Sequence, residues 1–268
     1  MTEIIHKELS YRVVGCVFDV HNGIGPGIRE ECYQKAMEQR LRECGLPFIA
    51  KPATRREFVY RGQVVDIFEP DFVVADKLIL ELKHQVEGFV PENESQVLNY
   101  LKFWNLELGL LANFALDKAV TQRVPRLPFE ASLDENYDHI TDLIREEHKP
   151  TLRTIRDSLL EIYQSVSLGY TATTYQKLVL VELRHRALHV QTDLVVEPVF
   201  HERKLPHTPI SPMIVGNHVC LQIEAIHDDV SARLIRTMQT HLELTGKPIG
   251  IVATFGRRKL SIRGVKPR

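Results

Sequence analysis

The stretch FEPDFVVADKLILELKHQ, residues 68–85, has the pattern of two β-strands joined by a tight turn. With the turn centred on Asp76, Asp71 and Glu81 are cross-strand partners whose Cβ atoms lie ~5 Å apart. Lys83 lies two residues beyond Glu81 and therefore points to the same face, while the leucines on either side of Glu81 point to the other. The stretch predicts a hairpin that brings two carboxylates and an ammonium to one face of a sheet.

The predicted pair of acids needs a neutralising partner. Two bare carboxylates at this separation repel by roughly 3 kcal/mol at an effective dielectric of 20, so one must take up a proton unless a cation lies between them. Ligands that are all oxygen favour a hard ion such as Mg²⁺ or Mn²⁺. Lys83 can then orient or help to deprotonate a water, or stabilise charge on a phosphate, so the pattern favours metal-assisted phosphodiester hydrolysis. An ordinary salt bridge on a half-exposed strand is the alternative, and for an isolated motif the more common one.

The sequence around the hairpin predicts an α/β sandwich. Apolar residues at helical spacing indicate three helices, over residues 4–22, 28–44 and 91–104. Alternating or continuous apolar runs indicate strands near 47–52, 56–61, 63–74, 78–83, 106–114 and 118–124. Helices that precede and interrupt a set of strands are typical of a mixed sheet flanked by helices.

The second half of the chain repeats the first. With an offset of 142 residues Tyr33 falls on Tyr175, and with an offset of 141 Gly109 falls on Gly250, in the same order of elements. We therefore predict two tandem copies of one domain and a charged, helical connector that Pro150 ends. The predicted boundaries are 1–130 for the first copy, 131–150 for the connector and 151–268 for the second copy.

The two copies differ at polar positions. Tyr33 persists as Tyr175, which indicates a structural role, whereas the acids and the lysine of the hairpin do not persist. In the second copy Ala172 replaces Glu30, Pro212 replaces Asp71, Gln222 replaces Glu81, Glu224 replaces Lys83, Thr237 replaces Gln96 and Tyr163 replaces His21. The comparison predicts that only the first copy holds the chemistry.

Four motifs stand in order in the first copy. They are Gly27-x-x-Glu30-x-x-Tyr33, Pro70-Asp71 with Glu81-x-Lys83, Gln96-x-x-x-Tyr100-Leu101-Lys102 and Gly109-Leu110-Leu111-x-Asn113-Phe114. In this order, and over residues 9–124, they resemble the motifs of the GxxExxY family of the PD-(D/E)XK nuclease superfamily. The second copy resembles the family only in its scaffold, and the tandem arrangement departs from the single-domain form of most members.

The resemblance implies two tandem restriction-endonuclease-like domains of α/β class, each a mixed sheet flanked by helices, with Mg²⁺ or Mn²⁺ in the first. Asp71 and Glu81 would be metal ligands and Lys83 the catalytic lysine. Glu30 would reach the metal, directly or through water, from the helix above the sheet. Gln96 would position the water or the scissile phosphate.

We therefore predict a metal-dependent deoxyribonuclease. Relatives include DNA exonucleases acting on ends or single strands, so the resemblance favours an exonuclease on single-stranded or end-containing DNA. The first copy would be catalytic, and the second a degenerate pseudo-nuclease domain that stabilises the fold or grips the strand. A non-catalytic DNA- or protein-binding module and a restriction-type endonuclease are the alternatives.

Composition is that of an ordinary globular protein, with 44% hydrophobic and 26% charged residues. The chain lacks the residue order of a signal peptide at its start and has no long uncharged apolar run, so we expect a cytoplasmic protein with no membrane partner. The four cysteines form no C-x-x-C pair, which argues against a zinc site and a disulfide framework. A net charge of −1 means that nucleic-acid binding must depend on local basic clusters; the oligomeric state stays open.

Overall fold

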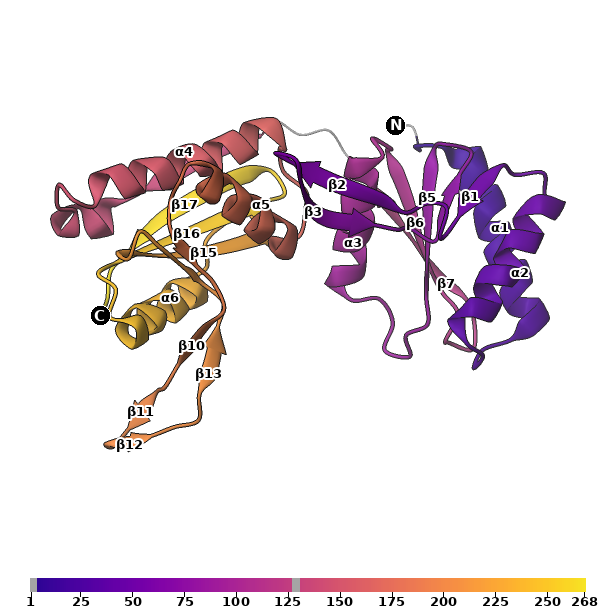
Figure 1. Ribbon diagram of the computed structural model, residues 1–268. Helices are drawn as coiled ribbons and strands as arrows, with labels where there is room; N and C mark the ends of the chain where they lie inside the picture. Colours follow the sequence, from indigo (N-terminus) through magenta and orange to yellow (C-terminus); the bar gives the residue numbers. More distant parts are fainter. Residues whose placement is uncertain (1–3, 127–130) are drawn as a thin grey trace. The chain divides into compact units, whose positions relative to one another are not determined.

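A computed structural model describes residues 4–126 and 131–268, which form two compact units (Figure 1). The first unit comprises Met1–Val59 and Asp66–Pro128, and the second comprises Tyr60–Val65 and Phe129–Arg268. Each unit is built on a mixed sheet flanked by helices, which confirms the predicted α/β class.

The first unit has a five-stranded sheet in the order β1-β4-β5-β6-β7. Strands β5 and β6 are parallel, and the other neighbours are antiparallel. Helices α1 and α2 pack on one face and α3 covers the other (Figure 1). The bounds are α1 Lys7–Ile24, α2 Glu30–Glu43, β1 Phe48–Ala50, β4 Phe72–Val74, β5 Leu78–Lys83, α3 Pro91–Phe103, β6 Leu108–Asn113 and β7 Val120–Pro125.

Alternation along β5 decides what each face of this sheet carries. Leu80 and Leu82 join the core under α1 and α2, so Glu81 between them points toward α3. Helix α3 lies very close to the sheet at Gly109, where an added Cβ would come within 2.1 Å of Val97 Cγ1. The close approach of α3 encloses the face that carries the acids.

Between β1 and β4 the chain forms a separate two-stranded hairpin, β2 (Arg56–Tyr60) with β3 (Gln63–Phe68). Its turn is at Arg61 and Gly62, which both have positive φ, as expected for a tight hairpin turn. The single strand predicted over 63–74 is in fact two strands, β3 and β4. Pro70 lies in the break, since proline has no N–H to donate to a sheet ladder.

The second unit has a six-stranded sheet in the order β8-β17-β16-β15-β14-β9. Helix α6 lies on one face, and α4 and α5 lie on the other (Figure 1). The bounds are β8 Ser132–Asn136, α4 Lys149–Ser165, α5 Ala172–His185, β9 Val190–Gln191, β14 Met213–Val215, β15 Val219–Ile226, α6 Ala232–Thr245, β16 Ile249–Gly256 and β17 Lys259–Val265.

Strand register repeats between the two units. The antiparallel pair Phe72 and Leu80 recurs as Met213 and Leu221, with both positions displaced by 141 residues. The parallel pair Leu78 and Leu108 recurs with the same displacement as Val219 and Ile249. The offset read from the sequence is therefore also the offset of the hydrogen-bonded register.

The tyrosine that is present in both copies makes the same hydrogen bond in each. The Tyr33 hydroxyl donates to the carbonyl oxygen of Gly25 at 2.7 Å, and the Tyr175 hydroxyl donates to that of Ser167 at 2.7 Å. Both acceptors lie eight residues earlier in the chain. Tyr33 and Tyr175 tie the two helices of each copy together, as their persistence predicts.

The prediction of a helical connector over 131–150 is wrong. This segment contains strand β8, which pairs in parallel with β17 at the edge of the second sheet, and a short 3-10 helix, η1 (Asp138–Leu143). Pro150 does not end a helix but lies in the first turn of α4, where a residue without an N–H loses no helical bond. The predicted boundary at residue 130 lies outside the described residues.

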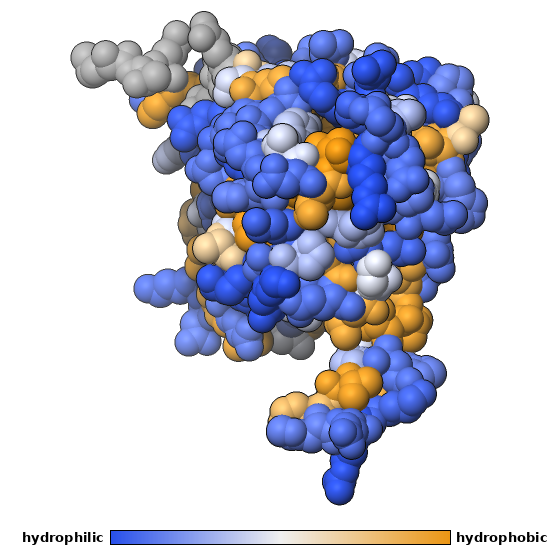
Figure 2. All heavy atoms as spheres, turned by 90° about the vertical axis from the view of Figure 1, so that its left-hand side faces the viewer, coloured by the Kyte–Doolittle hydropathy of each residue, from blue (hydrophilic) through white to orange (hydrophobic). Residues whose placement is uncertain are grey.

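An arm extends from the second unit between β9 and β14 (Figure 1). It consists of β10 (Leu194–Val196) with β13 (Thr208–Ile210) and, further out, β11 (Val199–Phe200) with β12 (Arg203–Lys204). Figure 2 shows hydrophobic surface on the arm, to which exposed Phe200 contributes. In the described residues no helix is long and apolar enough to span a membrane.

Candidate active site

Asp71 and Glu81 face each other at the end of the β4–β5 hairpin. The observed partner pair of Phe72 and Leu80 puts Asp71 opposite Glu81, as the turn centred on Asp76 predicts. The backbone N–H of Asp71 donates to Glu81 Oε2 at 3.2 Å, and the N–H of Leu82 donates to Asp71 Oδ2 at 2.7 Å. Their exposed fractions are only 3% and 4%, so both acids lie in the interior.

Burial of Glu81 makes its ionisation costly. Desolvation and then the charge of Asp71 raise the pKa of Glu81 to about 7, against the opposing influence of Lys83. A carboxyl group with this pKa holds a proton in neutral solution for part of the time, unless further positive charge comes close. The pair is therefore poised to take up either a proton or a cation.

Lys83 and Gln96 complete the polar group under α3. The Lys83 ammonium donates to Glu81 Oε1 at 2.9 Å and to Gln96 Oε1 at 3.0 Å. The Gln96 amide in turn donates to the hydroxyl of Tyr100 at 2.8 Å. Burial and then the charge of Glu81 raise the pKa of Tyr100, which keeps its hydroxyl protonated. The ion pair of Lys83 and Glu81 that the salt-bridge alternative expects is present. It differs from an ordinary surface salt bridge because Glu81 is buried beside a second carboxylate, that of Asp71.

Lys51 is a residue that the sequence reasoning missed. It follows β1, and its ammonium lies 2.5 Å from Asp71 Oδ1 and 3.4 Å from Glu30 Oε1. Burial alone would lower the pKa of Lys51, but the bond to Asp71 and the charges of both acids raise it. In the second copy β9 pairs with β14 as β1 pairs with β4, and this register puts Asp193 at the position of Lys51. The comparison of the two copies that singled out the acids could therefore also have found Lys51.

Glu30 begins α2 and is more exposed than the buried pair, with an exposed fraction of 50% for its side chain. It reaches the site through Lys51 rather than by touching Asp71 itself. His21, by contrast, bonds through Nε2 to the carbonyl oxygen of Leu116 at 2.8 Å and stacks on Phe114. His21 therefore packs in the core beside the helices, whereas Glu30 lies at the edge of the acid pair.

The carboxylate oxygens of Asp71 and Glu81 suit a hard divalent cation that takes few of its ligands from the protein. In residues 4–126 and 131–268 no group of three or more His, Cys, Asp or Glu side chains could hold a metal ion, so an all-protein cage is not available. Mg²⁺ commonly needs only one or two carboxylates and keeps several waters. Asp71 and Glu81 provide such a pair, and burial, followed by the charge of Asp71, raises the pKa of Glu81.

The second unit has an amide in place of one of the two buried carboxylates. Gln222 occupies the position of Glu81 with the same exposed fraction of 4%. Its amide oxygen accepts from the Ser211 hydroxyl at 3.0 Å, and its amide nitrogen donates to Glu224 Oε1 at 2.7 Å. Pro212 stands where Asp71 stands in the first unit. The buried amide is satisfied without a cation, and the arrangement lacks both the acid pair and the lysine.

Comparison with known proteins agrees with this architecture. The family model of the PD-(D/E)XK nuclease superfamily matches the chain twice, over residues 7–126 and 149–265. No curated protein and no solved structure matches the chain. The two matched segments cover most of the sequence and correspond to the two predicted copies, so the chain belongs to the PD-(D/E)XK nuclease superfamily.

Proposed function

We propose that the first copy, residues 1–130, is a deoxyribonuclease dependent on Mg²⁺ or Mn²⁺, and that the second copy, residues 151–268, is a pseudo-nuclease domain. The order of the four motifs supports membership of the GxxExxY family within the superfamily. Its resemblance to exonucleases favours single-stranded DNA or DNA with a free end as the substrate. The proposed metal ligands are Asp71 and Glu81, with Glu30 reaching the ion directly or through water.

One observation carries the proposal: a buried pair of carboxylates lies beside a lysine in one unit, and an amide replaces one of the acids in the other. Buried acids are costly unless a positive charge compensates them. Lys51 pairs with Asp71 and Lys83 with Glu81, yet the pKa of Glu81 stays raised, so the pair can still accept a divalent cation. The hydrogen bonds of Gln222 illustrate how the same scaffold buries an amide at this position without a cation.

The geometry assigns separate tasks to the side chains. An ammonium has three N–H donors, and Lys83 uses two of them on Glu81 and Gln96, so the third is available for a water or a phosphate oxygen. Gln96 fixes the direction of that third donor, since Tyr100 holds its amide from the other side. A divalent ion between the acids would supply a water of lowered pKa and a counter-charge for the phosphate.

Lys51 acts on the metal-free form of this site. Its ammonium neutralises Asp71 and bridges to Glu30, and thereby occupies the side from which a cation would approach the carboxylate. Lys51 and a divalent ion held by Asp71 would therefore compete for the same carboxylate.

The test is degradation of end-labelled single- and double-stranded oligonucleotides with Mg²⁺ or Mn²⁺, followed as a product ladder. Asp71→Asn, Glu81→Gln and Lys83→Ala should each abolish degradation while the circular dichroism spectrum is retained. Lys77→Ala, on the exposed turn of the same hairpin, is the matched control and should leave the rate unchanged. Activity at the level of the unmodified protein in the three site variants would rule out the assignment.

Two further observations separate the alternatives. A covalently closed circular single strand resists an exonuclease, because it offers no end, but is cut by a restriction-type endonuclease that accepts single strands. A non-catalytic binding module would bind linear DNA equally well with or without chelator and leave it intact. Ladder formation on linear DNA with an intact circle is the result that the proposal requires.

A further inference from the structure

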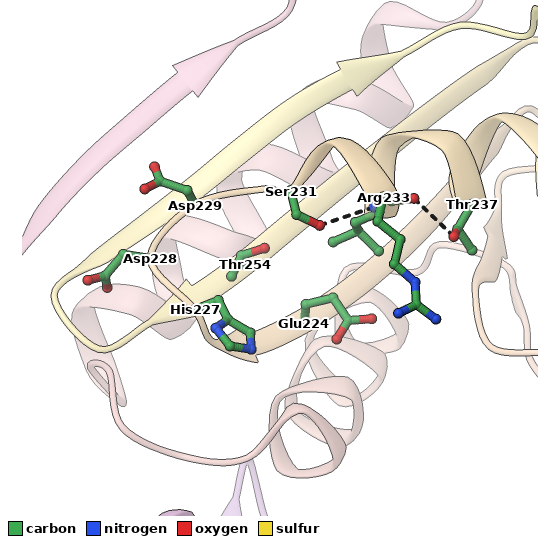
Figure 3. Close-up of a pocket in the computed structure, with 9 residues that line it drawn as sticks. Glu224, His227, Asp228, Asp229, Ser231, Arg233, Thr237 and Thr254 are labelled. Carbon is green, nitrogen blue, oxygen red and sulfur yellow. Dashed lines mark hydrogen bonds between the residues drawn. The ribbon is translucent and has the colours of Figure 1, made fainter. Parts of the chain in front are cut away.

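The second unit has a pocket with a volume of about 640 Å³ on the face covered by α6 (Figure 3). Glu224 of β15, Thr254 of β16 and Arg233 of α6 line it, together with His227 from the loop between β15 and α6. Ligand pockets for small molecules commonly have volumes of ~300–1,000 Å³. The pocket is therefore large enough for a single nucleotide.

The pocket occupies the position that the candidate active site has in the first unit. Glu224 pairs with Thr254 across the parallel strands β15 and β16, as Lys83 pairs with Asn113 across β5 and β6. Thr237, which also lines the pocket, stands on α6 where Gln96 stands on α3. The second copy has thus kept an opening at this place although its acid pair and lysine are gone.

Thr254 has an unsatisfied hydroxyl in this pocket. Its exposed fraction is 1%, and its Oγ1 has no hydrogen-bond partner among the described residues. At the same position of the first unit, the Asn113 side chain is fully used, because it accepts from the N–H of Gln85 and donates to the carbonyl of Gln85. A buried hydroxyl without a partner is costly, so it points to a bound group that completes its bonding.

The positive charge in the pocket is concentrated at the start of α6. The Arg233 side chain is exposed, and it forms no ion pair within the described parts of the chain. Ser231 caps the helix by accepting from the N–H of Leu234, and it lines the pocket at the start of α6 together with Arg233 (Figure 3). A guanidinium beside a helix N-terminus is suited to a phosphate group.

The negative charge across from Arg233 comes from Glu224. The other two carboxylates of the pocket are already paired: Asp228 with Arg258, and Asp229 with Lys259 at 2.5 Å. Among the described residues Glu224 accepts from the neutral amide of Gln222 alone, so its carboxylate can accept further N–H groups. The lining is therefore complementary to a ligand that is anionic at one end and carries N–H donors at the other.

We propose that this pocket binds a 5′-phosphorylated nucleotide whose base carries an amino group, and does not hydrolyse it. The phosphate would lie against Arg233 and the first turn of α6, and the N–H edge of the base would donate to Glu224. Guanine suits this lining best, because a carboxylate can accept from both its N1–H and its amino group. The ligand is either a free nucleotide or the 5′ end of a DNA strand, and only the second source rests on the proposed nuclease function.

The experiment is calorimetric titration of the full chain with deoxyguanosine 5′-monophosphate in the presence of chelator. Removal of a charged hydrogen bond predicts that Arg233→Gln weakens binding about tenfold or more. Thr254→Val, which has nearly the same shape, should weaken it severalfold without loss of folding. Arg236→Gln removes the same charge from an exposed position of the same helix outside the pocket lining and is the control, with unchanged affinity.

The source of the nucleotide is decided by a second titration with a 5′-phosphorylated single-stranded oligonucleotide that begins with guanine. Binding at least tenfold tighter than that of the free nucleotide assigns the site to a strand end, and equal or weaker binding assigns it to the free nucleotide. Absence of binding, or equal affinity in the unmodified protein and in both pocket variants, overturns the proposal. Both titrations contain chelator, so their outcome does not depend on metal-dependent catalysis. Nuclease activity is measured separately with Mg²⁺ or Mn²⁺, and its loss in Lys83→Ala concerns the first unit alone.

Discussion

Replacement of Glu81 by glutamine should stabilise the metal-free protein in alkaline solution while it abolishes activity. The carboxyl group of Glu81 is buried and faces Asp71, so its pKa is raised to about 7 from an ordinary value of 4.5. Glutamine has the same shape and keeps an oxygen that can accept from Lys83. It carries no charge to desolvate, as Gln222 demonstrates at the matching position of the second unit.

The direction of the pH effect follows from proton binding. Between the two pKa values the folded protein keeps a proton on Glu81 that the unfolded chain has already released, so the free energy of unfolding falls as the pH rises. A displacement from 4.5 to about 7 corresponds to roughly 3 kcal/mol once the pH exceeds the folded value. At pH 5 the unfolded chain has released only part of its protons, and the loss is about 1 kcal/mol.

The assay is urea denaturation of both proteins with chelator present, at pH 5 and at pH 8. The free energy of unfolding of Glu81→Gln minus that of the unmodified protein should increase by roughly 2 kcal/mol between these conditions. Glu31→Gln, which removes an exposed acid from the first turn of α2, is the control and should give a nearly constant difference. A difference for Glu81→Gln that stays constant or decreases with pH would refute the account of the buried pair.

Other substitutions test the packing under α3 and the role of Lys51. Gly109→Ala should destabilise the first unit by roughly 1–3 kcal/mol, because its Cβ would come within 2.1 Å of Val97 Cγ1. Gly15→Ala on α1 should instead stabilise by about 1 kcal/mol, because its Cβ meets no atom within 4 Å beyond its neighbours and its own helix backbone; thermal denaturation ranks the two, and equal effects would contradict the packing described. Lys51→Met should raise the affinity for Mn²⁺ about tenfold, or by about 1.4 kcal/mol, because it removes the ammonium that holds Asp71. Calorimetry measures this change, and an unaltered or weaker affinity would show that Lys51 does not compete with the ion.

The sequence by itself determined the hairpin and the repeat. Side chains alternate along a strand, and a tight turn fixes which residues face each other, so local spacing alone predicted Asp71 opposite Glu81 with Lys83 on the same face. The second copy supplied an internal comparison, and the register displaced by 141 residues confirmed it. The hairpin follows from a period of two residues along a strand, and the repeat follows from the recurrence of one sequence pattern in the second copy.

Only the tertiary structure decided what approaches the hairpin from elsewhere in the chain. Lys51 is twenty residues from Asp71 in the sequence and follows a different strand, and no local period relates the two positions. The charged sequence of β8 lacks the alternation of apolar residues that indicates a strand, and by itself it predicts a helical connector. In the structure it is a strand because the edge of β17 satisfies its backbone groups. Pairing of distant segments depends on hydrogen bonds and charges that meet only after folding, and for this reason the ion pair of Lys51 and the pocket beside Thr254 emerged only from the structure.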